Sequence, residues 1–376
     1  IGGNMNIPVC IPSITDKEVE YVTKALKEGW ISARSPYVDE FEKKFAEWVG
    51  TKYAVSTSSG TTALHLTLRV LDVGKGDEVI IPSFTMIATA LAVVYCGARP
   101  VFVDADPETW CMDVSQIEDK ITNKTKVILP VHIYGHPCDM DVINDIAHEH
   151  CLWVVEDAAE AHGAEYKGKK AGALSNIGCF SFFANKLIST GEGGMITTDS
   201  RYVYEHLQWL KDMAFNDHPA LRFIHREIGY NYRMTTMQAA LGLAQLERSD
   251  ELINARRRNA KLYMELLDGI DGITLPVEKP YVKNVYWMFG ILIDKDRFGI
   301  SRDKLMEELS KRGIGTRPFF YPMHLQPCLR YLGLYDGERY PVAERLSRDG
   351  LYLPSSSDLT PEQIEYVVKA IKEVSK

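Results

Sequence analysis

The chain has 376 residues, of which 45% are hydrophobic, which exceeds what one hydrophobic core usually holds, so a large domain and a smaller one are expected. Its formal net charge of -8 disfavours nonspecific attraction to nucleic acid or to an anionic membrane, because their phosphates are repelled on average. The seven cysteines form no CxxC pair, and the longest mostly apolar stretch, residues 86–96, is far shorter than the ~20 residues of a membrane span. We therefore expect a cytoplasmic protein without a disulfide framework or a membrane anchor.

Short apolar runs alternate with helical patterns from about residue 52 onward. Strands are predicted at residues 53–56, 78–82, 100–103, 126–131, 153–156, 179–183 and 194–198, and helices begin near residues 61, 86 and 140. This alternation is typical of βα units and predicts an α/β fold with a mainly parallel sheet. We assign this large domain, with an N-terminal arm, to residues 1–250.

A long helical pattern over residues 236–266 leads out of the large domain. It contains three consecutive arginines, Arg256 to Arg258, which we interpret as a solvated helix face, with an anion site as the alternative. The rest of the chain has its own pattern, with strands at residues 287–293 and 315–319 and helices at 302–312 and from 361. Residues 251–376 are therefore predicted to form a smaller C-terminal α+β domain.

A first polar segment, residues 58–62, follows an apolar strand and opens a helix. Backbone N–H groups at a helix start carry positive partial charge, so those of Gly60 and Thr61 suit a phosphate. The hydroxyls of Ser59 and Thr61 can add donors. An ordinary helix N-cap is the alternative for this segment.

A second segment, residues 153–160, is an apolar strand that ends in carboxylates. Ligands bind at the carboxyl ends of parallel strands, so Asp157 and Glu160 should face a crevice. A carboxylate beside a pyridine nitrogen keeps that nitrogen protonated and strengthens the ring as an electron sink. We choose Asp157 for this role, and an N-cap aspartate is the alternative.

A third segment places Lys186 between an apolar strand and the glycine-rich turn at residues 189–194. A lysine in such a place can lose solvation, which lowers its pKa and frees the amine to attack an aldehyde. Most lysines are exposed solubilising residues. Lys186 becomes the nucleophile candidate because it follows a hydroxyl-bearing strand at the same sheet edge as Asp157.

In this order the three segments resemble the sugar aminotransferases of the DegT/DnrJ/EryC1/StrS family, from Gly29-Trp30-Ile31-Ser32 to Arg317-Pro318-Phe319-Phe320-Tyr321-Pro322. The resemblance implies fold type I, the aspartate aminotransferase-like fold. It implies that Lys186 carries a Schiff base with pyridoxal 5'-phosphate (PLP), with pyridoxamine 5'-phosphate as the intermediate form. It further implies that Asp157 pairs with the pyridine nitrogen and that Ser181, with the Gly60-Thr61 backbone, holds the phosphate.

Three more residues receive roles from the resemblance. Glu160 stands where many relatives have Gln near the phenolic oxygen of the cofactor, and Glu there is similar to the perosamine-type enzymes. Asn231 is implied to reach the phosphate in the neighbouring subunit, which makes a homodimer with shared sites the expected partner arrangement. Met86 stands where the family commonly has an aromatic side chain against the pyridine face, so it either packs there by its thioether or belongs to the core.

The resemblance implies transfer of the amino group of L-glutamate to C4 of a nucleotide-linked 4-keto-6-deoxyhexose. GDP-4-keto-6-deoxy-D-mannose is the expected substrate, in O-antigen lipopolysaccharide synthesis, and UDP- or dTDP-linked sugars are the alternative. Arg233 and Arg317 are candidates for binding substrate anions, because a guanidinium grips carboxylates and phosphates bidentately, although ordinary ion pairing explains them equally well. His162 and His324 are candidates for substrate hydroxyls, with structural hydrogen bonding as the alternative. No metal ligand set is expected.

Two rival interpretations remain. A nucleotide-dependent oxidoreductase on a doubly wound fold also has βα alternation, but no GxGxxG follows the first strand. A noncatalytic, PLP-binding regulatory protein could use the same scaffold, and the presence of Lys186, Asp157 and Ser181 argues against it.

Overall fold

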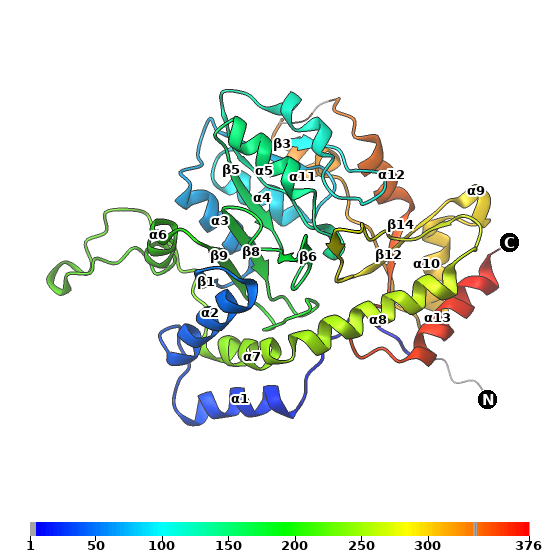
Figure 1. Ribbon diagram of the computed structural model, residues 1–376, viewed down its shortest axis with the longest axis horizontal. Helices are drawn as coiled ribbons and strands as arrows, with labels where there is room; N and C mark the ends of the chain where they lie inside the picture. The colour runs from blue at the N-terminus through cyan, green and yellow to red at the C-terminus, as the bar shows by residue number, and fades with distance from the viewer. Residues whose placement is uncertain (1–4, 334, 336, 376) are drawn as a thin grey trace.

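The computed structural model describes residues 5–333, 335 and 337–375, and a seven-stranded sheet lies at its centre (Figure 1). Its strands are β1 (Tyr53–Thr57), β2 (Glu78–Pro82), β3 (Arg99–Val103), β4 (Thr125–Ile128), β5 (Trp153–Asp157), β8 (Ile177–Ser181) and β9 (Gly194–Thr198). The order across the sheet is β1-β9-β8-β5-β4-β2-β3, and only the pairs made by β9 are antiparallel. The predicted α/β fold with a mainly parallel sheet is confirmed.

Helices pack around this sheet, and most residues of its strands are buried. They are α1 (Asp16–Lys27), α2 (Pro36–Val49), α3 (Gly60–Val70), α4 (Ile87–Tyr95), α5 (Met140–Glu149), α6 (Arg201–Lys211) and α7 (Thr236–Glu247). Their starts follow local chemistry: the Ser59 hydroxyl accepts the backbone N–H of Thr62 at 3.1 Å at the start of α3, and Thr235 forms a capping box with Gln238 at the start of α7. Such caps fix the place where each helix begins at the end of the preceding strand or loop.

A second, antiparallel sheet lies in the C-terminal part of the chain, with the order β10-β12-β14-β13. Its strands are β10 (Ile273–Thr274), β12 (Phe289–Ile293), β13 (Arg317–Pro318) and β14 (Gly350–Leu353), and a small ribbon joins β11 (Val282–Lys283), β6 (Glu165–Tyr166) and β7 (Lys169–Lys170). Its helices are α8 (Ser249–Leu267), α9 (Lys295–Phe298), α10 (Arg302–Lys311), α11 (Pro327–Tyr331), α12 (Pro341–Asp349) and α13 (Pro361–Val374). Ile7 belongs to the apolar cluster of this region. The N-terminal arm therefore reaches the C-terminal core. The division of the chain into two domains at residue 250 stays a prediction.

The long helix predicted over residues 236–266 is two helices, α7 and α8, which are interrupted at Arg248. The guanidinium of Arg248 is drawn to α1, where it donates to Glu18 at 2.8 Å and to the carbonyl of Ser13 at 3.3 Å. The interpretation of Arg256 as part of a solvated face is wrong, because its exposed fraction is only 4%. Its guanidinium donates to the Trp287 carbonyl at 2.8 Å and to the Ser357 hydroxyl at 3.1 Å, which compensates for its removal from water.

All seven cysteines are unpaired in the structure. Among the residues that the structure describes, none of the helices combines the length and the apolar character that a membrane crossing demands.

Candidate active site

A cavity of about 290 Å³ opens at the carboxyl ends of β5 and β8. Its walls come from the start of α3, the loop before α4, the segments after β5 and β8, and three aromatic residues from the C-terminal part. Its lining residues include Ser59, Gly60, Thr61, Thr85, Met86, Asp157, Glu160, Ser181, Asn185, Lys186, Trp287, Phe320 and Tyr352. The structure thus brings together the three segments on which the sequence prediction rests.

One end of the cavity is formed by the first turn of α3 against the end of β8. A Cβ atom on Gly60 would lie 2.7 Å from the Cβ of Ser181, and one on Gly194 would lie 2.4 Å from the carbonyl oxygen of Ser59. Only glycine allows these backbones to approach so closely. The helix start therefore presents its free N–H groups beside the Ser181 hydroxyl, an arrangement that suits a phosphate. The N-cap alternative holds at the same time, since Ser59 caps Thr62.

Asp157 ends β5 in the cavity wall and has an exposed fraction of 6%. Its Oδ2 atom accepts a hydrogen bond from the Thr89 hydroxyl at 2.8 Å, and its Oδ1 atom accepts the backbone N–H of Ala159 at 3.2 Å. The hydroxyl of Thr89 also lies 2.9 Å from that of Thr85. Burial raises the pKa of Asp157, whereas the two hydrogen bonds act in the opposite direction and favour the carboxylate. The carboxylate is thus fixed in orientation by α4.

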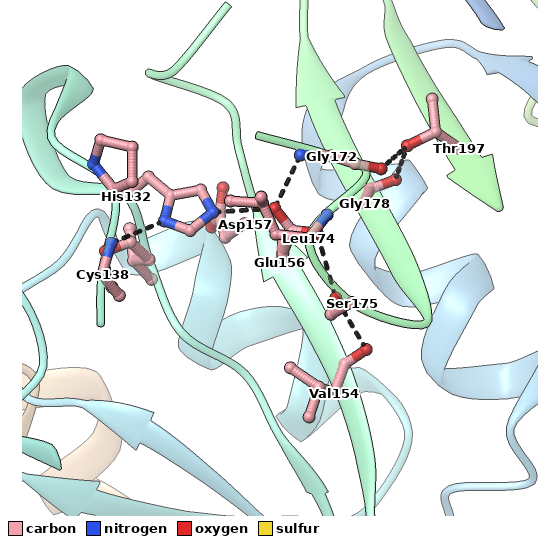
Figure 2. A network of polar contacts seen from close by, with 12 residues as sticks. His132, Cys138, Val154, Glu156, Asp157, Gly172, Leu174, Ser175, Gly178 and Thr197 are labelled. Carbon is pink, nitrogen blue, oxygen red and sulfur yellow. Dashed lines mark hydrogen bonds and ion pairs between the residues drawn. The ribbon is translucent and has the colours of Figure 1, made fainter. Parts of the chain in front are cut away.

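Behind Asp157, the neighbouring Glu156 is fully buried at the centre of a polar network (Figure 2). It accepts hydrogen bonds from the backbone N–H groups of Gly172 at 2.6 Å and Leu174 at 2.8 Å, and from the Ser175 hydroxyl at 3.1 Å. His132 completes the network: its Nδ1 accepts the N–H of Cys138 at 3.1 Å, so its Nε2 donates to Glu156 at 2.9 Å. This network holds the end of β5, from which Asp157 projects into the cavity.

Lys186 lies in the cavity wall after β8, and the exposed fraction of its side chain is 10%. Its Nζ atom is 3.9 Å from Oε1 of Glu160 and 3.5 Å from the centre of the Trp287 ring. Burial lowers the pKa of Lys186, and the carboxylates of Glu160 and Asp157 act in the opposite direction. Loss of solvation thus enlarges the fraction of uncharged amine, the form that attacks an aldehyde.

Glu160 faces Lys186 from the loop after β5 and is itself 4% exposed. Burial raises its pKa to about 7, whereas Lys186 and the backbone N–H of Tyr134, which donates to Oε2 at 2.7 Å, lower it. Tyr134 adopts a left-handed backbone conformation, with φ at 52°, which points this N–H at the carboxylate. Glu160 can therefore exchange a proton near neutral pH.

The structure places the other predicted residues as follows. Met86 lines the cavity with an exposed fraction of 46%, and its Sδ atom lies 3.0 Å from the N–H of Ala88. Asn231 and Arg233 lie outside the cavity lining, where Arg233 donates to Asn231 at 2.9 Å and to Asp212 at 2.8 Å. Arg317, which is exposed, lies beside the cavity residue Tyr352 without lining the cavity.

The two predicted histidines do not reach the cavity. His162 packs against Phe180 and Phe182 with no exposed surface, and burial lowers its pKa to about 3. His324 lies 2.8 Å from the Ser83 hydroxyl and 3.3 Å from Glu344. Structural hydrogen bonding accounts for His324 but not for His162, because both ring nitrogens of His162 are buried without a hydrogen-bond partner among the described residues.

Sequence reasoning missed Thr89, Tyr134, Trp287, Phe320 and Tyr352. Thr89 had a signal, because it stands four residues after Thr85 at a predicted helix start, on the face that turns to the strand ends. The sequence contains no such signal for Trp287, Phe320 and Tyr352, because their position depends on how the second sheet packs. Within the described part of the chain, one group of potential metal ligands lies close together, the exposed Glu118, Glu149 and His150, and none of them lines the cavity.

Comparison with known proteins gives a consistent result. The model of the DegT/DnrJ/EryC1/StrS aminotransferase family matches residues 12–372. The chain is 46% identical over 367 residues to GDP-perosamine synthase of Escherichia coli O157:H7 and 43% identical over 372 residues to that of Caulobacter vibrioides, with 98% of each chain covered in both cases. The solved structure of Streptococcus pneumoniae Spr1654 in its PLP form is 31% identical, with a TM-score of 0.92 and 98% of both chains covered.

Proposed function

The chain belongs to the DegT/DnrJ/EryC1/StrS aminotransferase family and is a PLP-dependent transaminase of fold type I, and we propose that it moves the amino group of L-glutamate to C4 of a nucleotide-linked 4-keto-6-deoxyhexose. GDP-4-keto-6-deoxy-D-mannose is the proposed acceptor and GDP-perosamine the product. The names of the two similar synthases support this choice. UDP- and dTDP-linked keto sugars are the alternative acceptors.

The cavity residues fit the cofactor. The close approach of Gly60 to Ser181 leaves the N–H groups at the start of α3 open to a phosphate, and Asp157 is a buried carboxylate held by hydrogen bonds from one side. We assign the phosphate to Ser59, Gly60, Thr61 and Ser181, the pyridine nitrogen to Asp157, the phenolic oxygen to Glu160 and one ring face to Met86. When bound, PLP supplies an aldehyde that condenses with amines and a cationic ring that withdraws electrons from the attached carbon.

The amine of Lys186 and the carboxylate of Asp157, brought to one cavity by the paired strands β8 and β5, are the observation that carries the proposal. Lys186 would hold the aldehyde of the bound cofactor through Nζ, and its uncharged Nζ would act as the base that moves the proton of the donor's α-carbon. Glu160 holds the exchangeable proton that faces Lys186. The aromatic side chains of Trp287, Phe320 and Tyr352 reduce the access of water to this proton transfer.

We further propose a homodimer with shared sites. Asn231 and Arg233 lie outside the cavity of their own chain, so their assigned roles toward phosphate or substrate require the cavity of a second copy. The loop after α6 projects from the body of the molecule (Figure 1) and carries exposed apolar side chains, among them Phe223 at 77% and Ile228 at 84%. Apolar side chains gathered on a projecting loop favour burial against a protein partner.

Arg317 remains a candidate for binding an anion of the substrate, and the cytoplasm remains the proposed location.

The test is incubation of the PLP-loaded protein with L-glutamate and, separately, the GDP-, UDP- and dTDP-linked 4-keto-6-deoxy sugars, with product masses followed by liquid chromatography. The proposal expects an amino sugar with the GDP-linked acceptor at the highest kcat/KM and formation of 2-oxoglutarate. Preference for a UDP- or dTDP-linked acceptor would select the alternative. A yellow protein that glutamate does not bleach and that aminates none of the sugars would support the noncatalytic interpretation.

Light scattering with size exclusion tests the dimer, and a monomer at working concentration would contradict it.

A further inference from the structure

Trp287 encloses the Lys186 amine from the C-terminal side of the cavity. Its exposed fraction is 3%, and the centre of its ring lies 3.5 Å from Nζ of Lys186. Its indole N–H donates to the carbonyl oxygen of Asn185, the residue before the lysine, at 2.8 Å. One side chain therefore contacts both the amine of Lys186 and the backbone from which that lysine projects.

Trp287 is itself held by a buried cation. Arg256, on α8, donates from Nη1 to the carbonyl of Trp287 at 2.8 Å, and its Nη2 atom lies 3.2 Å from Sγ of Cys10. The third contact of this guanidinium is the Ser357 hydroxyl at 3.1 Å. No carboxylate within the described ranges forms an ion pair with Arg256, so its hydrogen bonds fix it in place. Arg256 thus ties the helix that enters the C-terminal part, the N-terminal arm and the backbone of Trp287 together.

The opposite side of Trp287 is also fixed. A Cβ atom on Gly135 would lie 3.0 Å from the backbone nitrogen of Trp287, and the ring of Tyr134 stacks on that of Trp287 with centroids 6.2 Å apart. The same turn holds Glu160 through the N–H of Tyr134. The two groups that flank Nζ, the indole and the carboxylate, therefore share one support.

We propose that Trp287 is a positioning residue, which holds the amine of Lys186 in the cavity through its ring face and its hydrogen bond to Asn185, and that Arg256 keeps Trp287 in this position. The proposal rests on Lys186 being the reacting amine. An aromatic face attracts a cation electrostatically, and the attraction is larger where water is excluded. Trp287 therefore favours the ammonium form of Lys186 and limits the directions in which the free amine can point. Asp157, Glu160, Cys10 and His162 are the other titratable groups that act on this amine.

The test measures the rate at which the cofactor-free protein binds PLP covalently, followed by the visible band in a stopped-flow instrument between pH 6 and pH 10. The midpoint of this pH profile reports the ionisation of the Lys186 amine. Trp287→Leu is expected to move the midpoint to lower pH by roughly 0.5–1.5 units, because the cation loses its aromatic contact. The maximal rate should fall several-fold. Trp287→Phe keeps a ring face but loses the hydrogen bond to Asn185. Its midpoint should lie closer to that of the wild type than the midpoint of Trp287→Leu does.

Trp48→Leu is the matched control, because the Trp48 ring also faces a lysine, Lys170, with Nζ 5.0 Å from the ring centre, and neither residue lines the cavity. It should leave the profile unchanged. Arg256→Met should shift the profile in the same direction as Trp287→Leu by a smaller amount. A merely structural role of Trp287 predicts a lower melting temperature with an unchanged midpoint, and that result, or an alkaline shift, would overturn the proposal. Borohydride trapping followed by peptide mass spectrometry establishes separately whether Lys186 is the amine that reacts.

Discussion

Replacing Thr89 with valine removes the hydroxyl that orients Asp157 while it preserves the shape of the side chain. The hydrogen bond from this hydroxyl to Oδ2 of Asp157 is 2.8 Å long, and both side chains are buried. A hydrogen bond to a charged group contributes about 1.5–3 kcal/mol. This corresponds to a rise of about 1–2 units in the pKa of Asp157, or a roughly 10- to 100-fold change in the proton equilibrium between the carboxylate and the pyridine nitrogen that it faces.

The assay is the 15N chemical shift of the ring nitrogen in protein loaded with labelled PLP, which separates the protonated from the neutral ring. Thr89→Val should move the shift toward the neutral form and lower the rate of the half-reaction with glutamate by a comparable factor. Thr89→Ser keeps the hydroxyl and serves as the control, with a shift close to that of the wild type. A Thr89→Val protein that folds normally and retains both the wild-type shift and the wild-type rate would contradict this role of Thr89.

Three further results are expected. Asp157→Asn should still bind PLP but transaminate at least about 100-fold more slowly, the effect of losing a charged contact of about 3 kcal/mol, and an unchanged rate in single turnovers would remove Asp157 from its role. Glu156→Ala should lower the free energy of unfolding of the cofactor-free protein in urea by about 3–5 kcal/mol, because four donors, two of them buried, lose their acceptor, and a change below about 1 kcal/mol would contradict this. The folded cofactor-free protein binds the proton of Glu160 more tightly than the unfolded chain does, so this group lowers stability as pH rises from about 4.5 to about 7. This decline should be absent in Glu160→Gln when urea midpoints are measured between about pH 4.5 and about pH 7. The same pH dependence in the wild type and in Glu160→Gln would contradict this role of Glu160.

The sequence predicted the main sheet and the segments that surround the cavity, because both depend on local patterns. Buried parallel strands are continuous apolar runs, and a polar residue at the end of such a run has to face the edge where ligands bind. The order of strands and polar residues along the chain was therefore enough to place Asp157 and Lys186 together, and the resemblance to the family added Ser181. The comparisons confirm the resemblance to the family, fold type I and the PLP-dependent activity.

The errors have a common physical origin in contacts between segments that are far apart in the chain. Arg256 was predicted to be a surface residue because it stands in a run of arginines. Its hydrogen-bond acceptors are a carbonyl 31 residues later and a hydroxyl 101 residues later. The helix break at Arg248 depends on the position of α1. Trp287 lines the cavity because it packs in the same apolar cluster as residues of the large sheet, and no local pattern reports that packing.

The claim that Lys186 is the reacting amine is tested most directly by reduction of the PLP-loaded protein with borohydride, proteolysis and mass spectrometry of the peptides. We expect one pyridoxyl group per chain, on Lys186, with loss of the visible band, and no such peptide from Lys186→Ala. A pyridoxyl group on another lysine, or a protein that PLP does not colour, would contradict it.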